Sequence, residues 1–261
     1  MTNGLRRMTA IVWLTTIACT GEQKPSTEED TASGHTPAGD TDTATHDQET
    51  GDAPPSCADV GEGDVTVELH LRDLQSSADI TGAHLQYGNL DCTVDETGRV
   101  DLGGTPGSLL GVSGTADDYR PFSVLRPFPS FDALAKADLP SNGTTSLLAS
   151  ALEIPANPDA AIMSVTVFAD EGEAFIGEVT VNIDAAHDAV LVTDDSAAFG
   201  IREGDTTVEG SESTVVFVNV AAGSVTPTFS HPSGITCLDV PGTVEAKAGE
   251  LLITSYFCAT D

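Results

Sequence analysis

The five cysteines have the most distinctive chemistry in this chain. They are Cys19, Cys57, Cys92, Cys237 and Cys258. A cysteine thiol can be acylated, can bind a metal as the thiolate, or can join a second cysteine in a disulfide. No CxxC pair and no HxxxH cluster accompanies them, so their spacing does not fit a structural zinc site. Acylation and disulfide formation are the chemistries that remain.

Cys19 follows an amino-terminal segment with the features of an export signal. Arg6 and Arg7 precede a mostly apolar run of eleven residues, Met8 to Ala18. At about 1.5 Å per residue, a helix of this length spans only about half of a ~30 Å hydrocarbon core. The run therefore fits a signal peptide better than a membrane-spanning helix, and we predict that residues 1–18 are removed on export.

The stretch LTTIAC, which ends at Cys19, resembles the lipobox of bacterial lipoproteins. In that family a small residue such as Ala18 precedes a cysteine whose thiol carries diacylglycerol after cleavage. Thr16 stands where the family prefers leucine, and Thr16 with Ala18 also suits ordinary signal peptidase. The resemblance implies a lipid anchor on Cys19. It also implies sorting to the outer membrane, because Thr20 replaces the aspartate of inner-membrane lipoproteins. Plain secretion, with Cys19 as a free thiol, is the alternative.

The remaining four cysteines are an even number in an oxidising compartment, which favours two disulfides. Of the three pairings, we predict Cys57 with Cys92 and Cys237 with Cys258, because each bridge is then local to one half of the chain. Closing a loop of ~20 residues, as the second bridge does, stabilises a fold by about 3 kcal/mol.

The charge of the chain excludes one large class of partners. The sequence has 41 acidic and 10 basic residues, and removal of residues 1–18 takes away two arginines, which leaves a formal charge of −33. A surface this negative repels phosphate backbones and anionic lipid headgroups. We therefore predict no nucleic-acid binding, and membrane attachment only through the lipid.

No residue pattern indicates catalysis or a resident metal. The sequence contains no G-x-S-x-G, HExxH, P-loop or GxGxxG motif, and we predict no catalytic residue, metal or cofactor. His70 and His84 fall at expected solvent-facing strand positions, as two surface histidines or, alternatively, a metal patch. Two acidic loops are typical of hydrophilic turns, with calcium binding as the alternative. Their acids are Asp170, Glu171, Glu173, Asp194 and Asp195.

Residues 19–56 have the composition of a disordered linker. The segment from Thr20 to Ser56 contains nine acids, one lysine and no Leu, Ile, Val, Phe, Tyr or Trp. Such a segment cannot bury enough apolar surface to offset the entropy lost on ordering. We predict an acidic tether that holds the folded part away from the membrane.

Residues 57–128 have the pattern of a first β-sandwich. Val65, Val67, Leu69 and Leu71 alternate with polar residues, which indicates a strand with one buried face. Further short strands follow, punctuated by Gly and Asp every 8–12 residues, which is typical of an antiparallel sandwich.

The stretch from Asp64 to Phe128 resembles the carboxypeptidase regulatory-like domain of the transthyretin-like superfamily. Gly82-Ala83, the run from Thr93 to Gly98, Gly107 and Tyr119 stand where that family has its strand and turn signatures. Asp118 replaces the glycine that usually precedes the aromatic residue. The resemblance implies a seven-stranded sandwich without catalysis of its own.

Residues 129–158 are predicted to form a helical connector. Phe131, Leu134 and Leu139 have near-helical spacing after Ser130 as a cap, and a second apolar set follows Thr145. From Ile162 the strand pattern resumes, and residues 159–261 resemble a second transthyretin-like or immunoglobulin-like module. The sequence thus predicts a mainly β fold with two tandem antiparallel sandwiches joined by two short helices.

Two functions are compatible with these features. The first is a cell-envelope lipoprotein that acts as a non-catalytic binding or structural module for a protein or carbohydrate ligand of unknown identity. The second is a secreted or surface hydrolase with an unrecognised carboxylate site. Two carboxylates ~5–10 Å apart in a concave pocket would favour the hydrolase.

Overall fold

The computed structural model describes residues 57, 63–169, 174–194, 197, 200–210 and 212–260. The predicted signal peptide, Cys19 and the predicted linker lie outside these residues. All of the described residues belong to one compact unit, which begins at Gly51.

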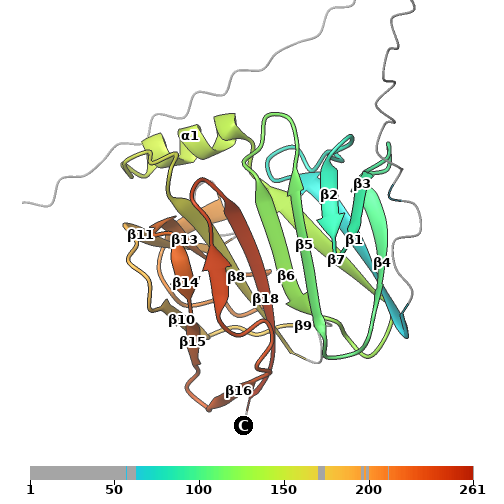
Figure 1. Ribbon diagram of the computed structural model, residues 1–261. Helices are drawn as coiled ribbons and strands as arrows, with labels where there is room; N and C mark the ends of the chain where they lie inside the picture. Colours follow the sequence, from blue (N-terminus) through green and yellow to red (C-terminus); the bar gives the residue numbers. More distant parts are fainter. Residues whose placement is uncertain are drawn as a thin grey trace, which may run out of the picture. The chain divides into compact units, whose positions relative to one another are not determined.

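Strands make up most of the described chain, as the sequence predicts (Figure 1). Those of the first half are β1 (Val65–Asp73), β2 (His84–Tyr87), β3 (Leu90–Thr93), β4 (Arg99–Gly104), β5 (Leu109–Thr115), β6 (Phe122–Pro127) and β7 (Ala133–Leu139). One helix follows, α1 (Asn142–Ala151). Those of the second half are β8 (Ala161–Ala169), β9 (Ala174–Phe175), β10 (Thr180–Ile183), β11 (Ala189–Thr193), β12 (Ile201–Glu203), β13 (Thr214–Val220), β14 (Gly223–Val225), β15 (Pro227–Ser230), β16 (Ile235–Cys237), β17 (Val244–Ala246) and β18 (Leu251–Thr260).

The first half packs two sheets face to face. In the smaller sheet β1 is central, with β4 antiparallel on one side and β7 parallel on the other. Its inward residues, such as Leu69 and Leu102, are buried with Leu85 and Leu110 from β2 and β5 of the larger sheet. The alternation of β1 is therefore the one that the sequence predicts, because one face of the strand meets this core.

The larger sheet runs through both halves of the chain. Its order is β12-β11-β13-β8-β18-β6-β5-β2-β3, with β9 paired to β8 and β16 to β18. The C-terminal strand β18 lies between β6 and β8 and is parallel to both, which Figure 1 shows at the centre of the sheet. The prediction of purely antiparallel sandwiches is wrong in this respect, because strands distant in sequence meet here without a hairpin between them.

Two hydrophobic cores lie on opposite faces of this shared sheet. On β18, Leu251 belongs to the first core, whereas Leu252 and Tyr256 belong to the second. On β8, Ile162 belongs to the first core and Met163 to the second. Because neighbouring side chains of a strand point to opposite faces, each half packs against its own side of the sheet. The small sheets β10-β15 and β14-β17 contribute Val181 and Val244, among others, to the second core.

The connector contains one helix where the sequence predicts two. The stretch from Phe131 to Leu139, predicted as helix, contains β7 instead, in which Ala135, Ala137 and Leu139 are buried at a period of two. Pairing with β1 along seven residues outweighs the local helical spacing.

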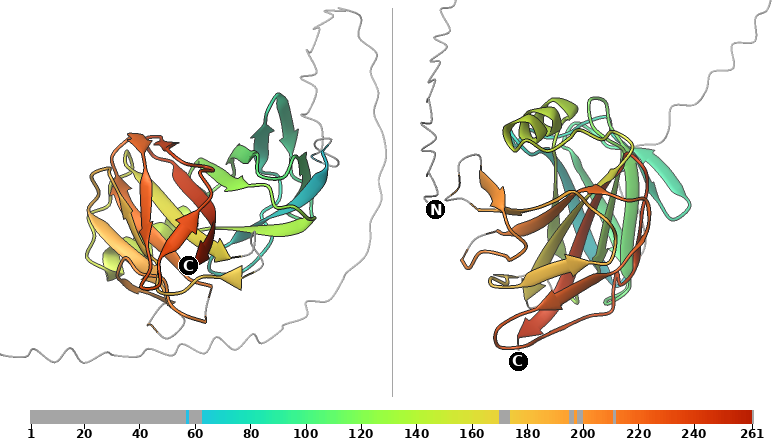
Figure 2. Two further views of the ribbon diagram at one scale, coloured as in Figure 1. Left: turned by 90° about the horizontal axis from the view of Figure 1, so that it is seen from below. Right: turned by 90° about the vertical axis from the view of Figure 1, so that its left-hand side faces the viewer.

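The second predicted helix is present as α1, which lies at one end of the strands in Figure 1 and in the right panel of Figure 2. Its N-cap is Ser141, whose hydroxyl accepts a hydrogen bond from the Thr144 backbone N–H. Thr144 is its only buried residue, and Leu147 is 56% exposed. The expected apolar stripe against a sheet is therefore absent from this helix.

Candidate functional site

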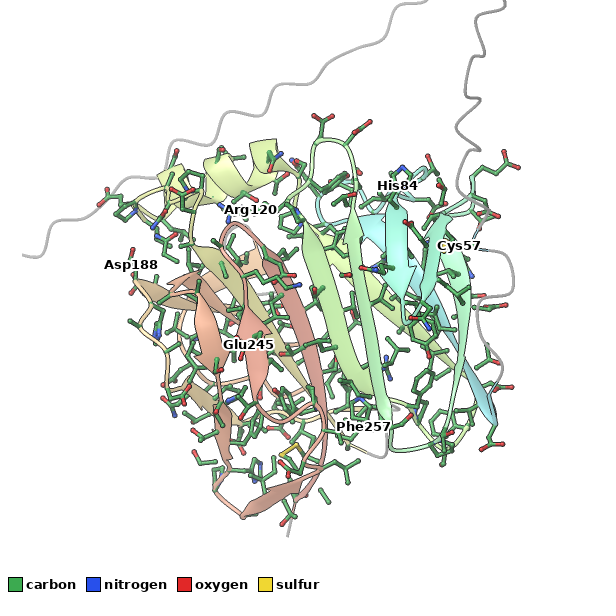
Figure 3. The ribbon with its side chains drawn as sticks, in the orientation of Figure 1. Cys57, His84, Arg120, Asp188, Glu245 and Phe257 are labelled. Atoms are coloured by element: carbon green, nitrogen blue, oxygen red, sulfur yellow. A yellow bond between two sulfur atoms is a disulfide. The ribbon has the colours of Figure 1, made fainter. Side chains whose placement is uncertain are left out.

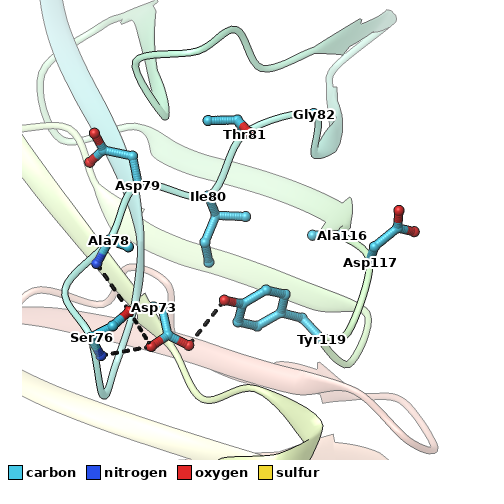
Figure 4. A pocket seen from close by; sticks show the side chains of 10 residues that line it. All are labelled: Asp73, Ser76, Ala78, Asp79, Ile80, Thr81, Gly82, Ala116, Asp117 and Tyr119. Atoms are coloured by element: carbon cyan, nitrogen blue, oxygen red, sulfur yellow. Dashed lines mark hydrogen bonds between the residues drawn. The ribbon is translucent and has the colours of Figure 1, made fainter. Parts of the chain in front are cut away.

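A hollow of about 480 Å³ lies near α1, at one end of the first half. Figure 4 shows its walls, which are the turn after β1 and the loop after β5. The residues that line it are Asp73, Ser76, Ala78, Asp79, Ile80, Thr81, Gly82, Ala116, Asp117 and Tyr119. We call it the acidic pocket, because its three charged residues are all aspartates.

Local sequence explains the shape of this turn. Asp73 accepts hydrogen bonds from the backbone N–H groups of Gln75 (3.1 Å) and Ser76 (2.7 Å), which is the usual way an aspartate stabilises a tight turn. Gly98, which immediately precedes β4, lies against Asp79 with a φ of 67°. A Cβ on Gly98 would lie 2.9 Å from the Cβ of Asp79, so only glycine fits there.

Asp73 is held as a carboxylate, not as an acid. Its Oδ2 atom accepts a hydrogen bond from the Tyr119 hydroxyl at 3.0 Å, and the Ser76 hydroxyl donates to its Oδ1. Hydrogen bonds from Ser76 above all lower the pKa of Asp73 below its usual value of 3.8. Desolvation, with the charge of Asp73, raises the pKa of Tyr119 to about 12. At neutral pH the pair is therefore one carboxylate and one neutral hydroxyl.

Asp79 is also engaged by a neighbour. One of its oxygens lies 2.6 Å from Nε2 of His70 on β1. His70 is buried, so its predicted place on a solvent-facing surface is wrong, because the turn that carries Asp79 folds over that part of the strand. His84 is exposed on β2 and lies 3.5 Å from the Thr93 hydroxyl. The two histidines thus form no common patch.

The acidic pocket can accept hydrogen bonds from a ligand, and its Asp73 is not poised as an acid. A glycosidase-type mechanism needs one carboxyl group with a raised pKa beside one that stays ionised. Asp73 has a lowered pKa, and Asp79 is bound to His70. Among the described residues, no group of three or more His, Cys, Asp or Glu side chains has the geometry to hold a metal ion.

The Asp73→Asn variant tests this assignment. We expect it to be less stable than the wild type at pH 7, because the amide accepts the turn's hydrogen bonds more weakly than a carboxylate. A carboxyl group whose pKa is lower in the folded state than in the unfolded state stabilises the fold at pH values above its unfolded-state pKa. That contribution is lost as the pH falls through its folded-state pKa. The difference in urea midpoint should therefore shrink below about pH 4. A difference that stays constant from pH 7 to pH 2 would contradict a charged Asp73.

The structure places the four cysteines of the fold in the two predicted pairs. The S–S distance is 2.09 Å for Cys57–Cys92 and 2.08 Å for Cys237–Cys258. The second bridge joins β16 to β18, where the two cysteines are directly opposite each other. Of the acidic loops, residues 170–173 and Asp195 lie outside the described residues, and Asp194 pairs with Arg202 at 2.8 Å.

Sequence reasoning missed an aromatic cluster at the other end of the shared sheet. The rings of Phe168 and Phe175 have centroids 4.7 Å apart, and those of Phe168 and Phe257 6.4 Å apart. The guanidinium of Arg126 lies against two of these rings. The four residues come from β6, β8, β9 and β18, so nothing in their sequence spacing indicates that they meet. Within the described residues, no helix is long and apolar enough to span a membrane.

Comparisons with known proteins give no family for this chain. No family model matches it, and no match is found among curated proteins. Solved structures with weak similarity include the TIE protein of Bacillus anthracis (12% identity, TM-score 0.24, 74% of this chain and 33% of that one). They also include a family CBM26 module of Eubacterium rectale Amy13K in complex with maltoheptaose (10% identity, TM-score 0.26, 76% of this chain and 96% of that one). A third is the minor pilin GBS52 of Streptococcus agalactiae (8% identity, TM-score 0.23, 75% of this chain and 97% of that one). At such scores these similarities carry no argument about this chain.

Proposed function

We propose that this protein is a cell-envelope lipoprotein whose folded part is a non-catalytic binding or structural module. The observation that carries the proposal is the lipobox-like stretch that ends at Cys19, followed by an acidic linker up to Ser56. A lipid on Cys19 would attach the chain to the outer membrane, and like charges in the linker would keep that segment extended. The ligand in this proposal is a protein or a carbohydrate.

The acidic pocket supports binding over hydrolysis. Two of its three aspartates are engaged: Asp73 by Ser76 and Tyr119, and Asp79 by His70. The pKa of Asp73 is lowered, which is the wrong direction for a general acid. The ionised carboxylate of Asp73 and the neutral hydroxyl of Tyr119 suit a ligand that donates hydrogen bonds. A hydroxyl-rich or amide-rich ligand meets that requirement.

The proposed modules are residues 57–128 and 159–261, with 129–158 as the connector. Residues 57–128 contain the six strands β1–β6, and β7 of the connector joins them as a seventh. This count and the positive φ of Gly82, Gly98 and Gly107 support the resemblance of the first module to the transthyretin-like superfamily. In this proposal β18 belongs to both modules, because it contributes residues to both cores. The connector supplies β7 to the first module and carries α1.

Metabolic labelling tests the lipid anchor. Cells grown with an alkyne analogue of palmitate should yield a labelled wild-type protein in the membrane fraction. The Cys19→Ser variant should lose the label and leave that fraction, because the labelled acyl chains belong to the diacylglycerol on the Cys19 sulfur. Thr16→Leu is the matched control, since it restores the leucine that the lipobox family prefers and should keep or increase the label. Equal labelling of wild type and Cys19→Ser would exclude a lipoprotein and leave plain secretion.

A further inference from the structure

Arg126 is a buried cation held between aromatic rings. It lies on β6, its side chain and backbone together are only 5% exposed, and its Cζ atom is 5.3 Å from the ring centre of Phe257. The ring centre of Phe168 is 5.9 Å away. Figure 3 labels Phe257 at the end of the sheet remote from α1, so this site is distinct from the acidic pocket.

Strand register brings these side chains together. Phe257 on β18 pairs with Phe168 on β8 in the parallel ladder, and Phe168 pairs with Phe175 across the β8–β9 hairpin. Because β18 also pairs with β6, Arg126 lies beside this row. Phe257 is buried, whereas Phe168 and Phe175 are partly exposed. Together they form an apolar wall with one cation at its edge.

Arg126 has no anionic partner in the described part of the chain. There, Arg72, Arg99 and Arg202 each pair with a carboxylate, and Arg120 donates to two backbone carbonyls. Arg126 has one long contact, 3.5 Å from Nε to the Pro127 carbonyl oxygen. Its terminal nitrogens have no hydrogen-bond partner among the described residues.

Those terminal nitrogens still reach solvent. Among the described residues, only one side-chain nitrogen or oxygen atom is both inaccessible to solvent and without a hydrogen bond, namely Oγ1 of Thr145. The Nη atoms of Arg126 also lack a hydrogen bond, so they must be accessible to solvent, although most of the residue is buried. Burial lowers the pKa of Arg126 to about 10, so the guanidinium is charged at neutral pH. Cation–π contacts offset part of the cost of burying that charge but leave its terminal N–H groups unpaired.

We propose that Arg126, with Phe168 and Phe257, binds the carboxylate of a small organic acid whose body is apolar or aromatic. A planar guanidinium matches a carboxylate with two parallel hydrogen bonds. The phenyl rings beside it would contact an apolar body and exclude water from the ion pair. This ligand is additional to the protein or carbohydrate of the proposed function, and the inference does not depend on the lipid anchor.

Three probes of similar chemistry test the proposal on the purified full chain. Phenylacetate has the carboxylate and the ring, phenylacetamide has the ring without the charge, and acetate has the charge without the ring. Ring-proton resonances of the phenylalanines, followed by NMR during titration, report binding directly. We expect saturable shifts with phenylacetate. Phenylacetamide should bind roughly tenfold or more weakly because it loses the charge-assisted hydrogen bonds. Acetate should also bind roughly tenfold or more weakly because it has no ring to bury against the phenylalanines.

Arg126→Met and Arg120→Met are the matched variants. Methionine keeps an unbranched side chain, and replacing a buried charge by an apolar residue is commonly tolerated. We expect Arg126→Met to bind phenylacetate at least about tenfold more weakly and Arg120→Met to bind as the wild type does. Equal binding of phenylacetate and phenylacetamide by the wild type would overturn the proposal without any variant. Unchanged phenylacetate binding by a folded Arg126→Met chain would overturn it as well. Labelling at Cys19 is measured separately, so failure of the anchor and failure of this site are distinguishable.

Discussion

A chain that stops after Glu250 is expected to lose the folded structure of both halves. The missing strand, β18, is the neighbour of both β6 and β8. It carries Leu251 of the first core, and Leu252 and Tyr256 of the second, all at most 5% exposed. Full burial of each such side chain contributes about 1.5–3 kcal/mol, and a domain is stable by only about 5–15 kcal/mol in total. Circular dichroism and limited proteolysis would measure the loss.

A chain that stops after Cys258 is the control for this truncation. It lacks the exposed Ala259 and Thr260 and keeps every core residue of β18, so it should unfold near the wild-type midpoint. A protease-resistant first half in the Glu250 truncation would contradict the prediction. It would mean that residues 57–128 fold independently of the second half.

Single substitutions in the same region give a graded version of the test. Leu252→Ala removes a fully buried side chain and should destabilise the protein by about 2–5 kcal/mol. Leu238→Ala makes the same chemical change at a residue that is 48% exposed, and should cost less than about 0.5 kcal/mol. Urea unfolding measures both.

Removal of either disulfide is the second change with a large expected effect. The residues joined are 35 apart for Cys57–Cys92 and 21 apart for Cys237–Cys258. The loop-entropy relation then gives losses of about 4 and about 3 kcal/mol when each pair is replaced by alanines. The first bridge ties Cys57 to the edge strand β3, and the second ties β16 to β18. We therefore expect the first pair to secure the entry of the fold and the second its exit.

Peptide mapping without reductant would show these two pairs directly, and urea unfolding of the double-alanine variants would give the losses. Cys19→Ser is the control, since that residue precedes the fold and should leave the unfolding midpoint unchanged. A bridge between the halves, such as Cys92 to Cys237, would contradict the pairing. Free thiols at all four positions would argue against export to an oxidising compartment.

The features that sequence alone determined are those encoded within short segments. The alternation of Val65, Val67 and Leu69 predicts β1, because a strand with one buried face needs a period of two. The second apolar set of the connector predicts α1, although its cap is Ser141. The two cysteine pairs follow from proximity in the chain, because both members of each pair lie in one half. Composition likewise indicates the signal peptide and the acidic linker, which remain predictions.

Tertiary structure alone decided which distant segments meet. Local spacing favours a helix from Phe131 to Leu139, yet β1 offers that segment a complete parallel partner, and β7 forms. His70 is buried because a turn folds over it, and Arg126 reaches Phe257 because the last strand enters between β6 and β8. A strand's own period reports which of its faces is buried, but not which strand lies beside it or in what register. Register is set by packing between segments far apart in the chain, and no local pattern carries that information.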